Sequence, residues 1–465
     1  MTVKDRGIDW MTFSLYLALV AIGWAMIYTV GYKSGYPDNF LDFLGTTAGR
    51  QLIWVGISLA GFFITYSIEA IFWRNFANII YTASLVLLVL VLIFGKTIKG
   101  ATSWFDFGGG MSFQPSEFAK FGTALALSSY LGNYSKGLKS WKHRFYALSF
   151  FMAPVALIML QPDAGSSLVF MGFFIVLYRE GFPGWVFVAG FLLGSILVAG
   201  LVNPPLAIVS IIALAGLAVY FRNMPSRHRW WALALVTLSV AAYFGFKYGY
   251  ALYTSLALTA LLLGFFLYHW GGRQRGMAVL VLFSFMLGSM VAFFANFAFN
   301  NVFAPHQQER ILVWLKPNEA DPQGAAYNLN HSKMAIGSGG LTGKGFLKGN
   351  LTQGNFVPEQ ITDFIFCAIG EEQGFLGVMV VITLYILLLG RIIVIGERQR
   401  SDFARLYAYG VASILFVHFF VNIGMTMGLV PTIGIPLPFL SKGGSSLLIF
   451  TIMIAVLLKL DARRI

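Results

Sequence analysis

Residues 77–94 read ANIIYTASLVLLVLVLIF, a run without a charged side chain that is long enough to cross the core of a bilayer as a helix. Similar runs recur along all 465 residues, of which 58% are hydrophobic and 11% charged, a composition that excludes a soluble globular protein. A helix satisfies its own backbone hydrogen bonds in lipid, and the alternating pattern of a membrane β-barrel is absent. The sequence therefore predicts an all-α polytopic membrane protein.

We expect about fourteen membrane-spanning helices. No small-residue cleavage site follows the first apolar run, so this run is predicted to be a retained anchor rather than a secretory signal. The predicted spans cover residues 10–32, 52–70, 77–94, 116–132, 144–160, 165–180, 184–202, 206–221, 231–246, 250–270, 277–298, 366–395, 404–424 and 443–459.

The net charge of +13 is explained by membrane topology rather than by a nucleic-acid partner. If the N-terminus is cytoplasmic, the short inside loops receive most of the basic residues, among them Arg74, Arg179 and Arg222, as the positive-inside rule requires. Both termini are then cytoplasmic, and the basic residues that remain on the outer face suggest an anionic substrate. The single cysteine, Cys367, excludes an internal disulfide, and we expect it to be a small buried residue.

The longest polar passage lies between two hydrophobic runs and is predicted to form a large extracytoplasmic loop over residues 299–365. It contains Asp321, in the sequence ADPQGAAY at 320–327. An aspartate before a proline is often only a turn residue, but a carboxylate is also a suitable general base. In a membrane enzyme, a loop of this kind would be expected to contain the catalytic residues.

Two shorter polar passages are predicted at the same outer face. In QPSEFAK, at 114–120, Glu117 and Lys120 share one helix face, either as functional groups or as an ion pair that holds two helices together. In QPDAGSS, at 161–167, Asp163 is either a functional residue or the N-cap of the next span.

Two further passages complete the outer face. Glu371 and Glu372 form a pair of carboxylates at the edge of an apolar span, where a functional or ion-pairing role is the default interpretation. The run at 428–446 has too many prolines and glycines to continue a helix, so it is predicted to be a broken or re-entrant segment that lines a cavity.

These motifs together resemble those of the SEDS family, the polytopic peptidoglycan glycosyltransferases of bacterial elongation and division. The opening GIDWMTFSLYLALVAIGWAMIYT is more similar to the elongation members, of the RodA type, than to the division members, of the FtsW type. The motifs that carry the resemblance, in chain order, are QPSEFAK, QPDAGSS, ADPQGAAY, AIGSGGLTGKG, VPEQITDFIFCAIGEEQG, NIGMTMGLVPTIGIPLPF and SKGGSSL.

The resemblance implies a fold and an activity. The fold would be one transmembrane domain over 1–465, with the family's ten-helix core and about four additional helices inserted at 204–298. These additional helices carry almost no intramembrane charge, which favours a peripheral, lipid-facing role over a second substrate site. The activity would be polymerisation of lipid II on the outer face of the bacterial cytoplasmic (inner) membrane, in cell elongation and the maintenance of cell shape. The alternatives are a division-specific polymerase and a flippase for lipid-linked precursors.

The resemblance also implies partners. These are a class B penicillin-binding transpeptidase, other membrane proteins of the elongation complex, and membrane lipid.

Asp321 occupies the position of the family's essential aspartate, which implies that it is the general base. A diphosphate leaving group needs nearby cations rather than a proton, and a divalent ion such as Mg²⁺ or Mn²⁺ is a further source of positive charge. The chain departs from the family at His331, where glutamine is common, and at Lys442, where an aromatic residue is common. The candidate substrate-binding residues are Glu117, Lys120, Asp163, Lys344, Glu371, Lys442, Ser445 and Ser446, with Arg310 and Lys333 as weaker candidates.

Overall fold

The chain folds into two compact units, which are described separately. The first consists of Met1–Phe182 and Ala320–Ile465, and the second of Pro183–Glu319. The computed structural model describes residues 7–32, 36–98, 100–106, 108, 112–134, 140–222, 228–270, 274–303, 305–317, 319, 321, 324–354 and 356–463.

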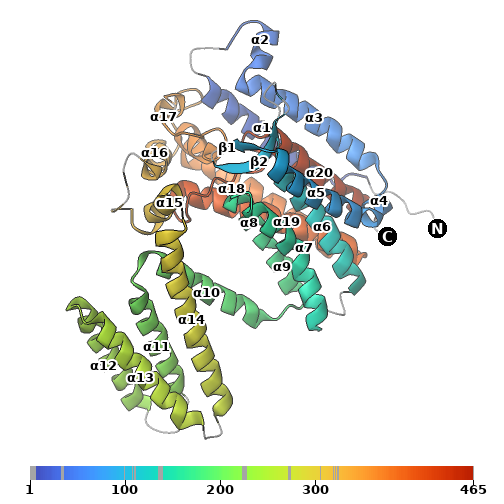
Figure 1. The fold of residues 1–465 in the computed structure, drawn as a ribbon. Helices are drawn as coiled ribbons and strands as arrows, with labels where there is room; N and C mark the ends of the chain where they lie inside the picture. The colour runs from blue at the N-terminus through green and yellow to red at the C-terminus, as the bar shows by residue number, and fades with distance from the viewer. Residues whose placement is uncertain are drawn as a thin grey trace. The chain divides into compact units, whose positions relative to one another are not determined.

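The first unit is a bundle of membrane helices (Figure 1), and α6, α19 and α20 are buried along most of their length. α20 packs against α3, α19 packs against α6 and α18, and α1 packs against α18. The helices of this unit are α1 (Trp10–Gly31), α2 (Phe40–Gly45), α3 (Thr47–Ser67), α4 (Ala70–Asn75), α5 (Ala77–Phe94), α6 (Pro115–Tyr134), α7 (Trp141–Met159), α8 (Ala164–Val169), α9 (Phe173–Arg179), α16 (Ala325–Ser338), α17 (Asn350–Gln353), α18 (Ile365–Glu397), α19 (Asp402–Met427) and α20 (Gly444–Ala462).

The segment between α5 and α6 contains three short antiparallel strands, which the sequence analysis did not predict. They are β1 (Lys96–Ile98), β2 (Ala101–Asp106) and β3 (Ser112–Phe113), paired in the order β1-β2-β3. The exposed ends of the first two strands are joined by an ion pair of 2.7 Å between Lys96 and Asp106. This small sheet leaves the fold class unchanged, because all the long elements are helical.

The second unit contains a four-helix block with a hydrophobic core of its own. In α11 (Pro205–Arg222), α12 (His228–Lys247), α13 (Ala251–Trp270) and α14 (Arg275–Asn301), the buried side chains include Leu217, Tyr220, Leu262 and Phe285. α10 (Gly184–Val202) packs along α14, and α15 (Pro305–Leu315) completes the unit. The block corresponds to the predicted segment 204–298; its description as an insertion stays a prediction.

The all-α polytopic membrane fold is confirmed. Within the described residues, eleven helices are long and apolar enough to cross a bilayer: α1, α3, α5, α10 to α14, and α18 to α20. The other three predicted spans correspond to α6 and α7, which carry charged residues in their first turns, and to α8 and α9, which a 3₁₀ turn at Phe170–Gly172 separates. All fourteen predicted spans therefore coincide with helices.

A cluster of ion pairs joins three helix ends of the first unit. Asp9, before α1, accepts hydrogen bonds from Arg391 of α18 (2.7 Å) and from Arg398, the C-cap of α18 (2.8 Å). Arg398 also pairs with Asp461 at the end of α20. The start of α1 and the end of α20 are therefore on one face of the unit, and the starts of α18 and α20 lie at the opposite face. Burial raises the pKa of Asp9, but the hydrogen bonds from Arg391, Thr12 and Arg398 outweigh burial and hold this pKa well below its ordinary value.

Replacement of Asp9 by alanine is expected to lower the free energy of unfolding by about 2 kcal/mol, because it removes charge-assisted hydrogen bonds and the N-cap of α1. The stabilisation by Asp9 is present above the ordinary carboxyl pKa of about 4 and is lost as the pH falls below it. Thermal unfolding in detergent at pH 7 measures the change. Asp42→Ala, at an exposed carboxylate in α2, is the matched control. Equal melting temperatures for the two variants would contradict this role of the cluster.

Candidate active site

The first two polar motifs meet at the starts of α6 and α8. The side-chain amide of Gln114 donates to Asp163 Oδ2 (3.0 Å) and to Ser166 Oγ (3.2 Å). Asp163 accepts from the backbone N–H of Ser166 (3.0 Å) and from its hydroxyl (2.7 Å). The predicted N-cap role of Asp163 is therefore confirmed, and the same carboxylate also connects α8 to the segment that precedes α6.

Glu117 and Lys120 form an ion pair in the interior of the first unit. The ammonium group lies 2.7 Å from Glu117 Oε1, and both side chains are almost completely buried. The hydroxyl of Ser446 lies 3.5 Å from the other carboxylate oxygen of Glu117. This contact brings the first motif to the start of α20, which contains Ser445 and Ser446 in its first turn.

The segment between α19 and α20 is broken, as predicted, and polar side chains satisfy its backbone. The side-chain amide of Asn422 donates to the carbonyls of Ile435 (2.7 Å) and Asp363 (2.9 Å). His418 lies 2.9 Å from the carbonyl of Pro436. Asn422 therefore joins the broken segment to the segment that leads into α18, and α19 supplies the partners that an unpaired backbone needs inside a membrane.

Lys442 lies just before α20, and its backbone N–H donates to the carbonyl of Ile361 (2.9 Å). Partial burial and the nearby Arg50 guanidinium lower the pKa of Lys442, while Glu359 opposes this change. The side chain is nevertheless partly exposed, unlike the buried ammonium of Lys120. Lys442 is therefore a cation that an anion can reach at this face.

Lys344 and Glu371 form a second, separate cluster. The fully buried Glu371 carboxylate accepts hydrogen bonds from Lys344 Nζ (2.6 Å), from the backbone of Leu351 (3.0 Å), and from the backbone and hydroxyl of Thr352 (2.8 and 2.7 Å). In the described part of the chain, no hydrogen bond links this cluster directly to Glu117 or Lys442. Glu371 therefore fastens the loop that precedes α17, which is the ion-pairing role expected of an intramembrane acid.

Glu372 differs from its neighbour. It is fully buried, and neither of its carboxyl oxygens makes a hydrogen bond of normal geometry to the described residues. The expectation of a paired role therefore applies to Glu371 but not to Glu372. Cys367, close by, is buried and free, as predicted.

The loop before α17 docks into a break in α18 at Gly374, where φ is +64°. The backbone N–H groups of Lys344 and Gly345 donate to the carbonyls of Glu371 (3.0 Å) and Glu372 (2.9 Å). Gly343 has a φ of +80°, and a Cβ at this position would lie 2.1 Å from the Glu372 carbonyl oxygen. Only glycine fits there, because a side chain would meet rigid backbone.

Asp321 is exposed in the loop before α16, and its backbone carbonyl accepts from the N–H of Gly324 (3.2 Å). The neighbouring Pro322 and Gln323 of its motif lie outside the described residues. α16 is fastened to α19 through the hydroxyl of Ser332, which donates to the carbonyl of Thr426 (3.0 Å). Asp321 therefore lies at the beginning of a helix that packs on the same α19 that holds the broken segment.

The remaining candidates are dispersed. The ring of His331, a departure from the family pattern, is tilted by 30° against that of Tyr327, with ring centroids 3.9 Å apart. Lys333 is exposed on α16, and its ammonium approaches the backbone at Gly428. Arg310 belongs to α15 in the second unit. Among the described residues, no group of three or more His, Cys, Asp or Glu side chains could hold a metal ion.

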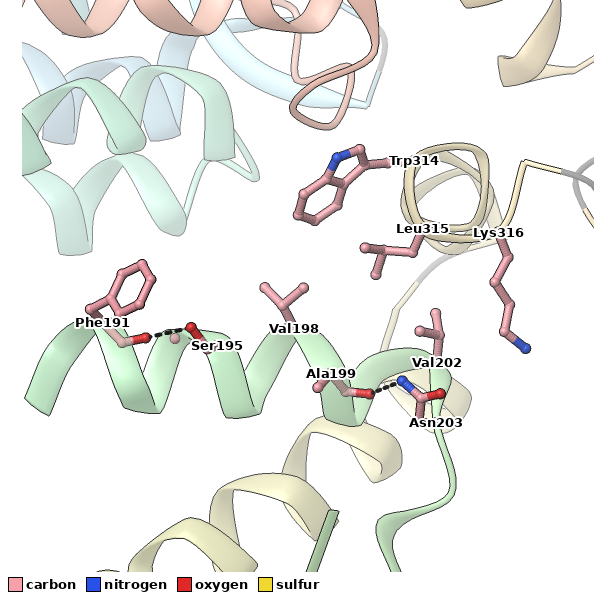
Figure 2. A pocket seen from close by; sticks show the side chains of 10 residues that line it. Phe191, Ser195, Val198, Ala199, Val202, Asn203, Trp314, Leu315 and Lys316 are labelled. Carbon is pink, nitrogen blue, oxygen red and sulfur yellow. Dashed lines mark hydrogen bonds between the residues drawn. The ribbon is translucent and has the colours of Figure 1, made fainter. Parts of the chain in front are cut away.

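A groove of about 700 Å³ in the second unit is lined by none of the predicted site residues. Figure 2 shows Phe191, Val198 and Val202 of α10 on one side, and Trp314 and Leu315 of α15 on the other. The polar groups of α10 in this groove, Ser195 and Asn203, bond to carbonyls of their own helix, so the lining is mainly apolar. This groove is not a centre of polar chemistry.

Sequence reasoning gave no role to three residues that organise the site. Gln114 and Asn422 lie within the quoted motifs, but their partners are distant in sequence. His418 was missed altogether, although a histidine in an otherwise apolar span is a signal in itself.

Comparison with known proteins agrees with this arrangement. The model of the FtsW/RodA/SpoVE family, described as "Cell cycle protein", matches residues 9–220 and 204–464. The chain belongs to the SEDS family of peptidoglycan glycosyltransferases. It is 31% identical to the peptidoglycan glycosyltransferase RodA of Treponema pallidum over the full length of both chains. It is also 31% identical to the peptidoglycan glycosyltransferase MrdB of Escherichia coli K12, over 84% of this chain and 79% of that one.

Solved structures show the same fold. A chain from the study "Structural coordination of polymerization and crosslinking by a peptidoglycan synthase complex" is 26% identical to this SEDS protein, with a TM-score of 0.64 over 99% of both chains. The rod shape determining protein RodA of Thermus thermophilus is 24% identical, with a TM-score of 0.55 over 99% of this chain and 98% of that one, and supports the fold alone.

Gly343→Ala is expected to lower the free energy of unfolding by about 1–3 kcal/mol, because its Cβ would displace the docked loop from α18. The matched control is Gly337→Ala in α16, where a Cβ meets nothing within 4 Å. This control should be neutral, or stabilising by up to about 1 kcal/mol. Thermal unfolding and limited proteolysis of the loop in detergent measure both. Similar behaviour of the two variants would show that the loop does not depend on this close approach.

Proposed function

We propose that this SEDS protein polymerises lipid II into glycan strands during cell elongation, on the outer face of the bacterial cytoplasmic membrane. The observation that carries the proposal is the convergence of four polar motifs at one end of the first unit. There the buried Glu117–Lys120 pair, the broken segment and the accessible cation Lys442 surround the start of α20. The names RodA and MrdB of the two 31% identical relatives favour elongation over division.

The side of the membrane follows from charge. The face that contains the start of α1 and the end of α20 also contains ion pairs made by Arg179, Arg391, Arg398, Arg405 and Arg463. A basic face of this kind is cytoplasmic by the positive-inside rule. The motif face is then extracytoplasmic, and a lipid-linked substrate reaches it with its tail still in the bilayer.

The chemistry assigns Asp321 as the general base. Its exposed carboxylate removes the proton of the acceptor sugar 4-hydroxyl while that oxygen attacks the anomeric carbon of a second lipid II, and undecaprenyl diphosphate leaves. Lys442 and Lys344 are the accessible cations for the diphosphate. The N–H groups at the start of α20, beside Ser445 and Ser446, favour the same negative charge.

The proposed substrate-binding residues include two carboxylates: Asp163, which is partly exposed, and Glu117, which is buried against Lys120. Lys120 and Glu371 act from buried positions, Lys120 by holding Glu117 and Glu371 by holding Lys344. A divalent cation could share the diphosphate charge, but none of the steps above requires one.

The proposed partner is a class B penicillin-binding transpeptidase, which would crosslink the new glycan. The similarity to a chain from a peptidoglycan synthase complex supports this proposal. Other membrane proteins of the elongation complex and surrounding lipid complete the proposed set of partners.

Asp321→Asn is expected to lower the rate of lipid II polymerisation by a factor of roughly a hundred or more, because an amide cannot accept the proton. The purified protein in detergent, with and without its cognate transpeptidase, is assayed for glycan on gels. Glu319→Gln, at an exposed carboxylate two residues upstream, is the control and should retain activity. Normal turnover by Asp321→Asn would remove Asp321 as the base. No glycan from the wild type even with the partner would favour the flippase, which a liposome transport assay then tests.

As the pH rises, the rate of polymerisation is expected to fall when Lys442 loses its charge. The lowered pKa of Lys442 brings this fall to a lower pH than a lysine with an ordinary pKa would give. Arginine stays charged, so Lys442→Arg should extend activity to higher pH. Initial rates between pH 7 and pH 11 measure this alkaline limb. Lys348→Arg, at an exposed lysine, is the control and should leave the pH at which activity falls unchanged. If wild type and Lys442→Arg lose activity at the same alkaline pH, Lys442 is excluded from diphosphate binding.

A further inference from the structure

We propose that His418 is a positioning residue, which holds the ammonium of Lys120 against Glu117 and couples this pair to the broken segment through Pro436. The inference rests on the proposed function of the same site, and it assigns a role to a residue that none of the motifs includes. His418 lies in α19, and its side chain is buried.

The two ring nitrogens of His418 have different partners. Nδ1 lies 2.9 Å from the carbonyl oxygen of Pro436, and Nε2 lies 2.9 Å from Lys120 Nζ. A carbonyl oxygen can only accept, so Nδ1 must carry the hydrogen. Nε2 then presents a lone pair to the ammonium, which donates. The surroundings therefore select one neutral tautomer of the ring.

The same geometry accounts for the environment of the buried ammonium. Lys120 donates to Glu117 Oε1 (2.7 Å) and to His418, and it lies 5.4 Å from the ring centroid of Phe450. The Phe450 ring is perpendicular to that of His418, with centroids 5.1 Å apart. A buried ammonium without acceptors is strongly unfavourable, so loss of His418 leaves one N–H unpaired and frees a long side chain to move.

This set of contacts spans the site. It runs from the Pro436 carbonyl, in the middle of the broken segment, through His418, Lys120 and Glu117 to Ser446 at the start of α20. One end of the path lies in the segment that carries Lys442, and the other lies four residues after Lys442, in the first turn of α20. His418 therefore fixes the position of the Glu117 carboxylate relative to the region where the diphosphate is proposed to bind, and it does so without contacting substrate.

Glutamine can reproduce both contacts, because its amide oxygen accepts from Lys120 while its NH₂ group donates to Pro436. Leucine fills similar space but provides neither contact. His418→Gln is therefore expected to retain most of the rate of lipid II polymerisation. His418→Leu is expected to lose roughly tenfold or more of kcat, with little change in KM, because the residue does not touch substrate.

The control is Ser413→Ala, which removes a buried hydroxyl of the same helix whose hydrogen bond goes to the carbonyl of Tyr409 in its own helix. It should keep the wild-type kcat. Full activity of His418→Leu, or equal losses in His418→Gln and His418→Leu when all variants melt at similar temperatures, would overturn the inference. Wild type that makes no glycan would instead contradict the proposed function.

A second readout does not depend on activity. Nitrogen-15 NMR of histidine-labelled protein in nanodiscs, assigned by comparison with His418→Gln, reports which ring nitrogen carries hydrogen. The inference requires His418 with hydrogen on Nδ1 and a bare Nε2, and a change at Nε2 in Lys120→Met. Hydrogen on Nε2, or a signal insensitive to Lys120→Met, would overturn it even if His418→Leu fails to fold.

Discussion

Peptide groups cannot be left without hydrogen-bond partners inside a membrane, and this SEDS protein interrupts its helices between α19 and α20. The rest of the polar end depends on how that break is satisfied. α19 provides Asn422 and His418 to three backbone carbonyls, and through the same residues it fixes the start of α18 and the Lys120 ammonium. The need to satisfy the backbone of the broken segment with hydrogen bonds thus determines where the Lys120 ammonium is held.

The first unit separates two kinds of electrostatic interaction. At the face of the start of α1 and the end of α20, arginines pair with carboxylates of other helices and hold helix ends together. At the opposite face, the Glu117–Lys120 pair is buried, while Lys442 is left accessible beside Arg50. Ion pairs at the first face stabilise the bundle, whereas the second combines buried pairs with accessible charge, which is the arrangement that binding of an anionic substrate requires.

Local features of the sequence were sufficient for much of the fold. The fourteen spans predicted from hydropathy all coincide with helices, the Asp163 cap was predicted from QPDAG, and the prolines after Gly428 predicted the break. Contacts between distant residues were not accessible in this way. Nothing in the sequence pairs Lys344 with Glu371, 27 positions away, or Lys120 with His418, 298 positions away. The strands β1 to β3 were missed because they are only two to six residues long, too short for an alternating pattern to distinguish them from a loop.

The spacing of Glu117 and Lys120 on a single helix has a consequence for biosynthesis. α6 must enter the membrane long before the ribosome has made His418 or Ser446. An uncompensated charge within a span opposes insertion, by up to about 3 kcal/mol at the centre of the span. Because the two residues are one helical turn apart, they neutralise each other within α6 from the moment it forms. The helix therefore enters the translocon with both members of the ion pair in place. His418 and Ser446 contact this pair only later, when α19 and α20 have been made.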